Sequence, residues 1–260
     1  MKLHGTTIVV TGAGRGIGAA LARSFAGEYP RGIVVADVDA EGVSSVADEI
    51  RDRGVAALGV HVDVSDSGQV ATLVRETEHA FGPPDVVCSN AGIAMGQGLH
   101  AAQQHWARSW AVNVMAHVHL AQAVLPRMSV RGQGYFLLTA SAAGLLGLPG
   151  DAPYSVTKGA AVGLAEWLAM TYGDSGVGVG VLCPLGVRTD LLMPAVDAGH
   201  PAARAVAEHA PIITPEEVAD AALRGIACGE FLILPHPEVR AMYATKATDP
   251  QAWLARHTAS

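Results

Sequence analysis

Short apolar runs rich in β-branched residues alternate along the chain with longer stretches whose apolar positions recur every three or four residues. The short runs predict strands and the longer stretches predict helices. We expect strands at 6–11, 32–37, 56–64, 84–92, 134–141, 177–184 and 230–235. We expect helices at 17–29, 40–53, 67–81, 103–129 and 153–173. Apolar strands that alternate with helices predict an α/β fold, with a doubly wound parallel sheet of about seven strands and helices on both faces.

One segment interrupts this alternation. Residues 185–213, between the last two expected strands, follow neither pattern. Long connections inside compact domains are often binding loops or lids. No linker, repeat or low-complexity segment divides the chain, so we expect a single domain over residues 1–260, with a substrate lid around 190–213.

The composition narrows the class of protein. The chain has 260 residues, of which 50% are hydrophobic and 16% charged, and this excludes a disordered protein. Its net charge of −7 argues against a nucleic-acid partner. The start of the chain lacks a signal-peptide pattern, and no apolar run is long enough to span a bilayer. We therefore expect a cytoplasmic protein without a membrane partner.

The three cysteines, Cys88, Cys183 and Cys228, are few and widely spaced. They are interpreted as reduced thiols rather than as disulfides or metal ligands. The eleven histidines show no zinc-binding spacing either, so no metal is expected.

A glycine-rich turn, "TGAGRGIG" at 11–18, joins the first expected strand to the first expected helix. Glycines permit positive φ angles and close approach of a ligand to the backbone. The free N–H groups and the dipole of a helix that begins near Ile17 favour a pyrophosphate. A glycine turn in this position predicts a Rossmann-type dinucleotide-binding site. The residues expected to contact the dinucleotide here are Gly12, Gly14, Arg15, Gly16, Ile17 and Gly18.

Asp37 ends the second expected strand, 19 residues after Gly18. A carboxylate in this position can accept hydrogen bonds from the adenosine ribose hydroxyls. The next residues are Val38 and Asp39, so a 2′-phosphate would meet two acidic groups, and this favours NAD over NADP. Arg15 could reach a 2′-phosphate and keeps NADP open as the alternative.

Tyr154 and Lys158, in "YSVTK", are four residues apart and share one face of a predicted helix. A tyrosine has a reference pKa of about 10, and a nearby ammonium favours its phenolate form. We therefore expect Lys158 to lower the pKa of Tyr154 toward the range useful for acid–base work. Ser141 ends the fifth expected strand, at the sheet edge where ligands bind, and its hydroxyl can hold a substrate oxygen.

Together these motifs, from about residue 5 to 235, resemble the short-chain dehydrogenase/reductase family. The glycine loop resembles the family's TGxxxGxG motif. By that resemblance Ser141, Tyr154 and Lys158 are catalytic, and Asn113 in "WAVNVMAH" supports a water-linked proton relay to the lysine. Tyr154 is then the acid–base, and Lys158 also binds the nicotinamide ribose.

Three further stretches resemble cofactor-binding motifs of the same family. "DV", which is Asp63 and Val64, resembles the adenine-contacting position, and "SNAG" at 89–92 resembles NNAG with Ser89 in place of the first Asn. "PLGVRT" at 184–189 resembles PGxVxT, with Leu185 where glycine is usual. The resemblance assigns cofactor contacts to Asn90, Ala91, Gly92, Tyr154, Lys158, Pro184, Gly186, Val187 and Thr189, and places Val187 and Thr189 at the nicotinamide carboxamide.

The family implies transfer of a hydride between NAD and a secondary alcohol or ketone, and a homodimer or homotetramer. An apolar substrate is expected from the apolar side chains of three segments near the site: Met95, Leu99, Leu145, Leu146, Leu148, Leu191, Leu192 and Met193. Two alternatives stay open: an NADP-dependent carbonyl reductase of the same fold, and a dinucleotide-binding protein without turnover. For His100, His105 and His236, surface or packing roles are the preferred interpretation.

Overall fold

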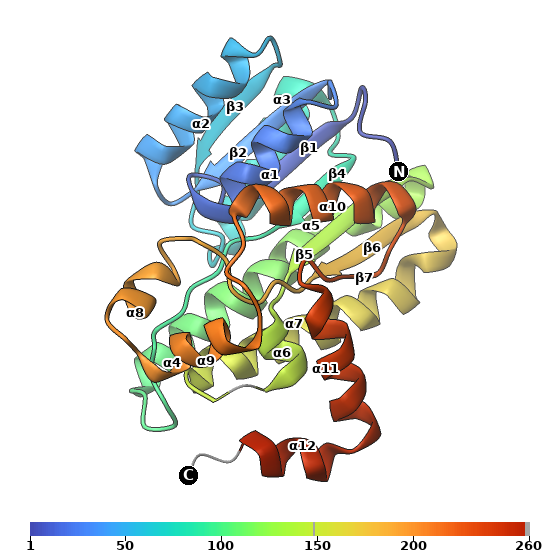
Figure 1. Ribbon diagram of the computed structural model, residues 1–260. Helices are drawn as coiled ribbons and strands as arrows, with labels where there is room; N and C mark the ends of the chain where they lie inside the picture. The colour runs from blue at the N-terminus through green and yellow to red at the C-terminus, as the bar shows by residue number, and fades with distance from the viewer. Residues whose placement is uncertain (148, 258–260) are drawn as a thin grey trace.

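In the computed structural model, which describes residues 1–147 and 149–257, seven parallel strands form one sheet in the order β3-β2-β1-β4-β5-β6-β7 (Figure 1). The strands are Thr7–Thr11 (β1), Gly32–Asp37 (β2), Ala57–His61 (β3), Val86–Ser89 (β4), Gly134–Thr139 (β5), Val177–Leu182 (β6) and Leu232–Ile233 (β7). The predicted doubly wound α/β fold is confirmed. The strand order reverses between β1 and β4, so the carboxyl ends of these two strands form the crevice where ligands bind in such sheets.

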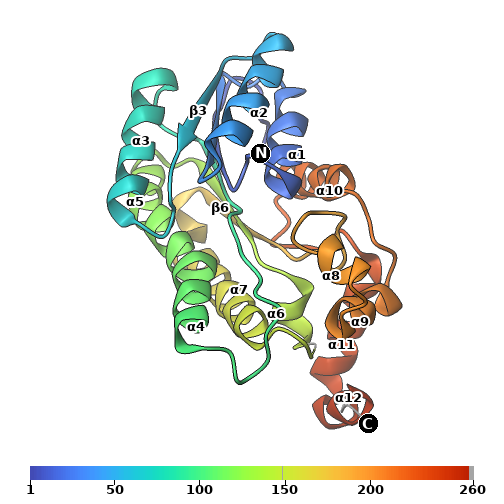
Figure 2. The same ribbon diagram turned by 90° about the vertical axis from the view of Figure 1, so that its left-hand side faces the viewer.

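Helices cover both faces of the sheet (Figures 1 and 2). One layer contains α1 (Gly16–Ala26), α2 (Ala40–Asp52) and α10 (Pro215–Cys228), and the other contains α3 (Ser67–Phe81), α5 (Ala116–Arg131) and α7 (Ala152–Tyr172). Alternate strand residues point into opposite layers: Ile8 packs with the first layer and Val9 with the second. Burial of both strand faces explains why the strands read as continuous apolar runs.

The segment expected to be one helix at 103–129 has three consecutive parts. Residues Gln103–Trp110 form α4, Ala111–Met115 form one turn of π-helix, and α5 follows to Arg131. Gly132 ends α5 with φ 68°, a left-handed conformation that glycine adopts without strain. π-Helical turns often occur at functional sites, and this one carries Asn113.

The segment at 185–213, which follows neither a helix nor a strand pattern in the sequence, contains regular structure. It contains two short helices, α8 (Met193–Asp197) and α9 (Pro201–His209). Its base is fixed by a parallel bridge between Val187 and Ile213.

After β5 the chain forms the short helix α6 (Ala142–Leu146), and a 3₁₀ turn at Gly173–Ser175 follows α7. After β7 it forms α11 (Pro237–Thr248) and α12 (Pro250–His257), which extend away from the sheet (Figure 1). None of the described helices combines the length and the apolarity needed to cross a membrane.

Candidate active site

A cavity of about 470 Å³ lies at the carboxyl ends of the strands. The predicted cofactor residues that line it are Gly12, Arg15, Gly16, Ile17, Gly18, Asp37, Val38, Asp63, Val64, Asn90, Ala91, Gly92, Tyr154, Lys158, Pro184 and Thr189. Three predicted contacts, Gly14, Gly186 and Val187, are not among the lining residues. Residues from six separate stretches of sequence therefore meet around one space.

The backbone of the glycine turn packs so closely against its neighbours that side chains have no room at Gly12 and Gly18. Without side chains, a dinucleotide can approach this backbone directly. A Cβ at Gly12 would lie 2.7 Å from the Ala91 Cα atom, and a Cβ at Gly18 would lie 2.1 Å from the Gly12 oxygen. Gly12 and Gly16 have φ angles of 63° and 55°. No side chain caps the start of α1 at Arg15, so the first N–H groups of the helix are available to an anion.

The Asp37 carboxylate lies at the end of β2, beside the glycine turn. Its Oδ2 atom accepts a hydrogen bond from the Gly14 backbone N–H at 3.0 Å, and its Oδ1 atom accepts one from Asp39 at 3.1 Å. A carboxylate offers about four lone-pair sites, so it can still accept from ribose hydroxyls. Gly14 does not line the cavity itself, but its N–H group holds the Asp37 carboxylate that does.

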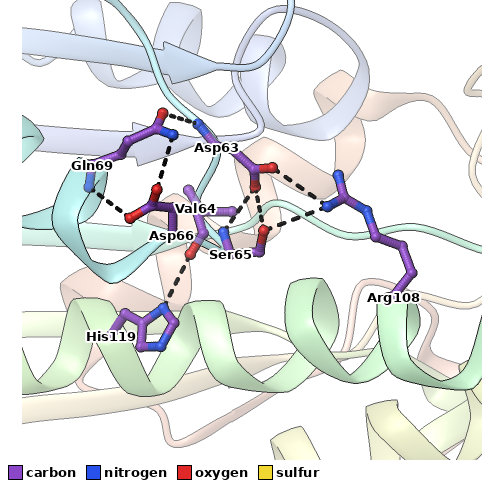
Figure 3. Close-up of polar contacts among 7 residues, drawn as sticks. All are labelled: Asp63, Val64, Ser65, Asp66, Gln69, Arg108 and His119. Atoms are coloured by element: carbon purple, nitrogen blue, oxygen red, sulfur yellow. Dashed lines mark hydrogen bonds and ion pairs between the residues drawn. The ribbon is translucent and has the colours of Figure 1, made fainter. Parts of the chain in front are cut away.

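Asp63 and Val64 form the far edge of the cavity, where Arg108 of α4 approaches them (Figure 3). Ser65 donates hydrogen bonds to Asp63 from its backbone and its hydroxyl, at 2.9 and 2.6 Å, and Arg108 lies 3.4 Å from the other carboxylate oxygen. Burial opposes ionisation of Asp63, but the Ser65 hydrogen bonds and the Arg108 charge outweigh it and lower the pKa of the carboxyl. Asp63 is therefore held as an anion at this edge.

The stretch after β4 is built around Asn90, which joins it to the glycine turn. The Asn90 side-chain amide donates to the backbone oxygens of Thr11 and Gly12, at 3.0 and 3.3 Å. Ser89, the departure from the family motif, points instead into the core, where its hydroxyl shares a 2.6 Å hydrogen bond with the Nδ1 atom of buried His117. Burial, followed by the charge of Lys158, lowers the pKa of His117 to about 3, so this imidazole is neutral.

Tyr154 and Lys158 lie together in the cavity wall, as the helical spacing predicts. The Lys158 ammonium lies 5.7 Å from the Tyr154 ring centroid and donates a 2.8 Å hydrogen bond to the backbone oxygen of Thr139 at the end of β5. The lysine is 2% exposed, and this burial lowers its pKa to about 8.

The pKa of Tyr154 differs from the expectation. Burial raises it above the usual value for a phenol, a hydrogen bond with Ser141 lowers it, and the nearby Asp151 and Cys183 raise it further. The lowering expected from Lys158 is therefore not found for the polypeptide by itself, because desolvation of the phenolate dominates. The positive charge of an oxidised nicotinamide would act in the opposite direction.

Ser141 and Asn113 do not line the cavity themselves, but they contact residues near it. Ser141 caps α6, its hydroxyl accepting from the Ala143 N–H at 3.1 Å. The Asn113 side chain is fully buried and exchanges two hydrogen bonds with the Ile93 backbone, at 2.8 and 2.9 Å, while also donating to the Thr157 hydroxyl at 3.0 Å. Its side chain thus holds the stretch that follows β4 against α7.

The stretch after β6 is supported by His236. The His236 Nδ1 atom accepts from the Leu185 N–H at 3.2 Å, and its Nε2 atom donates to the Gly186 oxygen at 3.0 Å. His236 is 2% exposed, so it supports this stretch from the interior and does not face the cavity. Val187 is also buried, and Thr189 is the residue of this stretch that reaches the cavity together with Pro184.

The apolar segments expected around the substrate are only partly in that position. Leu191 is half-exposed and lines the cavity. Leu145 and Leu146 are buried in the core, where their backbone oxygens accept hydrogen bonds from Lys246 and Trp253 of the C-terminal helices. Leu99 is 76% exposed, and Leu148 lies outside the described residues.

Three residues near the site were not anticipated: Arg108, Asp151 and Asp190. Arg108 and Asp190 line the cavity, and Asp190 lies 3.9 Å from Arg15. Asp151 precedes α7 as its N-cap, a position that its Asp-Ala-Pro sequence could have indicated. Arg108 and Asp190 carry no local signal, because tertiary packing brings them to the site. In the described part of the chain, no group of three or more His, Cys, Asp or Glu residues could hold a metal ion.

The doubly wound sheet and a cavity at the carboxyl ends of its strands are typical of dinucleotide-binding proteins. Residues 6–199 match the short chain dehydrogenase family, and the chain belongs to this family. It is 35% identical over 192 residues to meso-2,3-butanediol dehydrogenase of Serratia marcescens, covering 74% of this chain and 75% of that protein.

Two solved structures are similar over nearly the whole chain. A short chain dehydrogenase/reductase from Burkholderia phymatum in complex with NAD has a TM-score of 0.88 and 30% identity, covering 97% of this chain and 96% of that one. L-Sorbose reductase from Gluconobacter frateurii, complexed with NADPH and L-sorbose, has a TM-score of 0.82 and 27% identity, covering 90% and 97%. The family resemblance drawn from the motifs is confirmed, and a nicotinamide cofactor is supported.

Proposed function

We propose that this protein is an NAD(H)-dependent oxidoreductase that interconverts a secondary alcohol and a ketone. The observation that carries the proposal is the shared cavity: the glycine turn, Asp37, Tyr154 and Lys158 all line it. A binding protein without turnover would have no use for a half-buried phenol beside a buried ammonium. The relative from Serratia marcescens is named as a dehydrogenase of a secondary alcohol, which supports the same reaction class.

The residues that would hold the cofactor are the glycine turn and the start of α1 for the pyrophosphate, Asp37 for the ribose, and Asp63 with Val64 for the adenine. When bound, the nicotinamide supplies or accepts the hydride. Tyr154 gives a proton to the carbonyl oxygen or takes it from the alcohol. Lys158 stabilises the phenolate by its positive charge. Ser141, which hydrogen bonds with the phenol, orients the carbonyl or alcohol oxygen of the substrate. Asn113 holds the part of the cavity wall that begins at Ile93 against α7.

NAD is proposed over NADP because of the charges around the ribose position. Asp37 would face a 2′-phosphate with like charge. Arg15, which could compensate, lies 3.9 Å from Asp190 and shares its charge with that carboxylate. Both side chains of this pair are largely exposed, so the pair is weak and Arg15 remains the residue that favours the NADP alternative.

The substrate is proposed to be a small and partly apolar alcohol or ketone. Leu191 supports this from the lid segment, residues 190–213, while Ile93 and Ala94 line the cavity from the stretch after β4. With Leu145 and Leu146 in the core, the apolar lining is smaller than the sequence suggests.

A homodimer or homotetramer is proposed from the exposed apolar side chains of Trp110 on α4 and Val156, Trp167 and Met170 on α7. Such side chains are expected to be covered by a second copy of the chain. The cytoplasmic location stays a prediction.

The test is steady-state turnover of a panel of secondary alcohols with NAD, of the matching ketones with NADH, and of both with the NADP forms. We expect turnover with NAD(H), and a higher kcat/KM for NAD than for NADP. Higher kcat/KM with NADP would establish the alternative cofactor. Tight NAD binding without turnover of any member of the panel would establish a non-catalytic dinucleotide-binding protein.

A further inference from the structure

Asp151 joins the helix that carries Tyr154 to the stretch of chain after β4. Its Oδ1 atom accepts a 2.9 Å hydrogen bond from the Tyr154 backbone N–H and caps α7. Its Oδ2 atom accepts from the N–H groups of Met95 and Gly96, at 2.6 and 2.7 Å. One carboxylate thus holds two segments that lie 55 residues apart in the sequence.

The stretch held in this way is residues 93–97, and it forms part of the cavity wall. Ile93 and Ala94 line the cavity that Tyr154 also lines. Asn113 fixes the start of the stretch at Ile93, and the Ala152 N–H donates to the Gln97 oxygen at 2.9 Å near its end. The stretch between these points has no helix or strand hydrogen bonds of its own, so its position depends on Asn113, on Asp151 with its neighbour Ala152, and on a 2.8 Å side-chain hydrogen bond between Gln97 and His105 of α4 at its far end.

Asp151 does more than an ordinary helix cap. A cap accepts hydrogen bonds from its own helix, and Ser, Thr or Asn can do this as well as Asp. Here one oxygen is used for the cap and the other for a distant segment, and a carboxylate is the side chain that offers two oxygen acceptors with charge assistance. The geometry therefore indicates a second role for the Oδ2 atom.

We propose that Asp151 is a positioning residue that fixes stretch 93–97 relative to the Tyr154 phenol and so determines which substrates fit between them. The inference rests on the proposed function, because it assigns the substrate selectivity of that site. It predicts that the Oδ2 contacts affect substrate binding while the Oδ1 contact affects the stability of α7.

The charge of Asp151 gives an independent readout. The titratable groups that face Tyr154 are Asp151 at the start of α7, Lys158 on the same helix and Cys183 after β6, and the Ser141 hydroxyl bonds the phenol. Burial is the largest cause that raises the pKa of Tyr154, and the negative charge of Asp151 raises it further. Removal of that charge should move the pH profile of kcat/KM toward acid, which the loss of a helix cap elsewhere would not do.

The experiment compares Asp151→Ser and Asp151→Asn with wild type, and uses Asp66→Ser as the matched control. Asp66 caps α3 by accepting from Gly68 and Gln69. Asp151→Ser retains a cap but cannot reach both segments. We expect it to lower kcat/KM by about 10- to 100-fold, mainly through KM for the alcohol, because displaced substrate-positioning groups have effects of this size.

The same variant should change the order of preference among alcohols, shift the pH profile toward acid, and leave the Kd for NAD within about twofold of wild type, since Asp151 is not among the cavity-lining residues. Asp151→Asn should show the same acid shift with a smaller change in KM, because one oxygen acceptor remains. Asp66→Ser retains a cap and should leave the order of preference and the pH profile unchanged, with at most a small change in stability. If Asp151→Ser leaves the order of preference and the pH profile unchanged, or matches Asp66→Ser in all readouts, the inference is overturned.

Amide hydrogen exchange keeps this test separate from the proposed function. The Met95 and Gly96 amides should exchange much faster in Asp151→Ser than in wild type and Asp66→Ser. If wild type turns over no substrate, the proposed function fails, and with it the role of Asp151 in selectivity. If wild type is active and these amides stay protected in Asp151→Ser, the proposed function stands and the positioning role fails.

Discussion

The Lys158 ammonium and the Tyr154 ring face each other at 5.7 Å across one turn of α7, inside a cavity that the glycine turn also lines. This distance is within the range at which a cation is attracted to an aromatic ring. The Lys158 ammonium donates a buried hydrogen bond to the backbone oxygen of Thr139. Its charge therefore cannot move away from the phenol without loss of that hydrogen bond. The pair therefore places a fixed positive charge beside the phenol, although burial raises the pKa of Tyr154 in the polypeptide by itself.

Replacement of Tyr154 by Phe should abolish proton transfer and leave cofactor binding intact. We expect kcat to fall by at least about 10²- to 10⁴-fold, the usual contribution of a positioned acid–base group. The Kd for NAD, measured by fluorescence titration, should change little. Tyr172→Phe, at the end of the same helix, is the control and should retain activity. Near-normal turnover in Tyr154→Phe would remove this residue from the mechanism.

Replacement of Lys158 by Met should make the protein more stable while removing its activity. Burial lowers the pKa of this lysine from 10.5 to about 8, which corresponds to a cost of about 3 kcal/mol for the charged form at neutral pH. Loss of the hydrogen bond to Thr139 offsets about 1 kcal/mol. We therefore expect a higher free energy of unfolding by about 1–2 kcal/mol in urea at pH 7.

The stabilisation expected for Lys158→Met should depend on pH in a definite direction. A lysine whose pKa is lowered by folding destabilises the folded state fully below pH 8, and the cost disappears as the pH rises from about 8 to 10.5. The difference between wild type and Lys158→Met should decrease over that range. Lys2→Met, which removes an exposed lysine, is the control and should not stabilise the protein. A difference that stays constant with pH would contradict the assignment.

The sequence predicts those parts of the molecule that rest on local periodicity and on motifs. The seven strands and the spacing of Tyr154 and Lys158 follow from repeating patterns within short windows. The π-helical turn at Asn113 was not predicted, because its side chain gains hydrogen bonds to Ile93 and Thr157 that no local pattern records. Tertiary contacts here override local helix geometry.

Burial was predicted less well than secondary structure. Leu145 and Leu146 were expected at the substrate, but α11 and α12 cover them, and these helices follow the last expected strand. The pKa of Tyr154 was expected to fall because the spacing reveals the nearby Lys158, whereas the sequence does not reveal how deeply the phenol is buried. In both cases the error comes from parts of the chain distant in sequence that pack against the site.

Replacement of Asp37 by Ser should shift the cofactor preference toward NADP. Like charges about 4 Å apart repel by about 4 kcal/mol near a protein surface, and less when salt screens them. We expect the ratio of kcat/KM for NADP to that for NAD to rise by at least about tenfold, which corresponds to 1.4 kcal/mol. Asp39→Ser retains the cap of α2 and should change the ratio less. An unchanged ratio in Asp37→Ser would mean that Arg15 dominates the choice.

Replacement of Arg108 by Gln should weaken NAD binding slightly and in a salt-dependent way. Arg108 holds the Asp63 carboxylate at 3.4 Å, and both side chains are partly exposed (Figure 3). Pairs of this kind contribute about 0.2–1 kcal/mol, so the Kd for NAD should rise by up to about fivefold. The effect should decrease as NaCl is raised, because salt screens exposed charges. Arg127→Gln, which breaks the ion pair with Glu78 between α3 and α5, should not change the Kd.

Replacement of Gly18 by Ala should disrupt both the fold around the glycine turn and the binding of NAD. The new Cβ would lie 2.1 Å from the Gly12 oxygen and 2.7 Å from the Asn90 side-chain nitrogen, and neither can move without displacing the turn from β4. Overpacking of backbone costs about 1–3 kcal/mol and sometimes more, which would lower the melting temperature by several degrees in a chain of this size.

NAD at about 100 times its Kd stabilises a folded protein by about 2.7 kcal/mol, and a displaced turn should lose most of this increment. Thermal unfolding with and without NAD measures both effects. Gly173→Ala is the control: it has a right-handed helical φ angle and no atoms within 4 Å of the added Cβ, so both its melting temperature and its NAD increment should be retained. If Gly18→Ala retains the full NAD increment, the glycine turn is not the pyrophosphate site, because a ligand cannot bind normally against backbone that has moved.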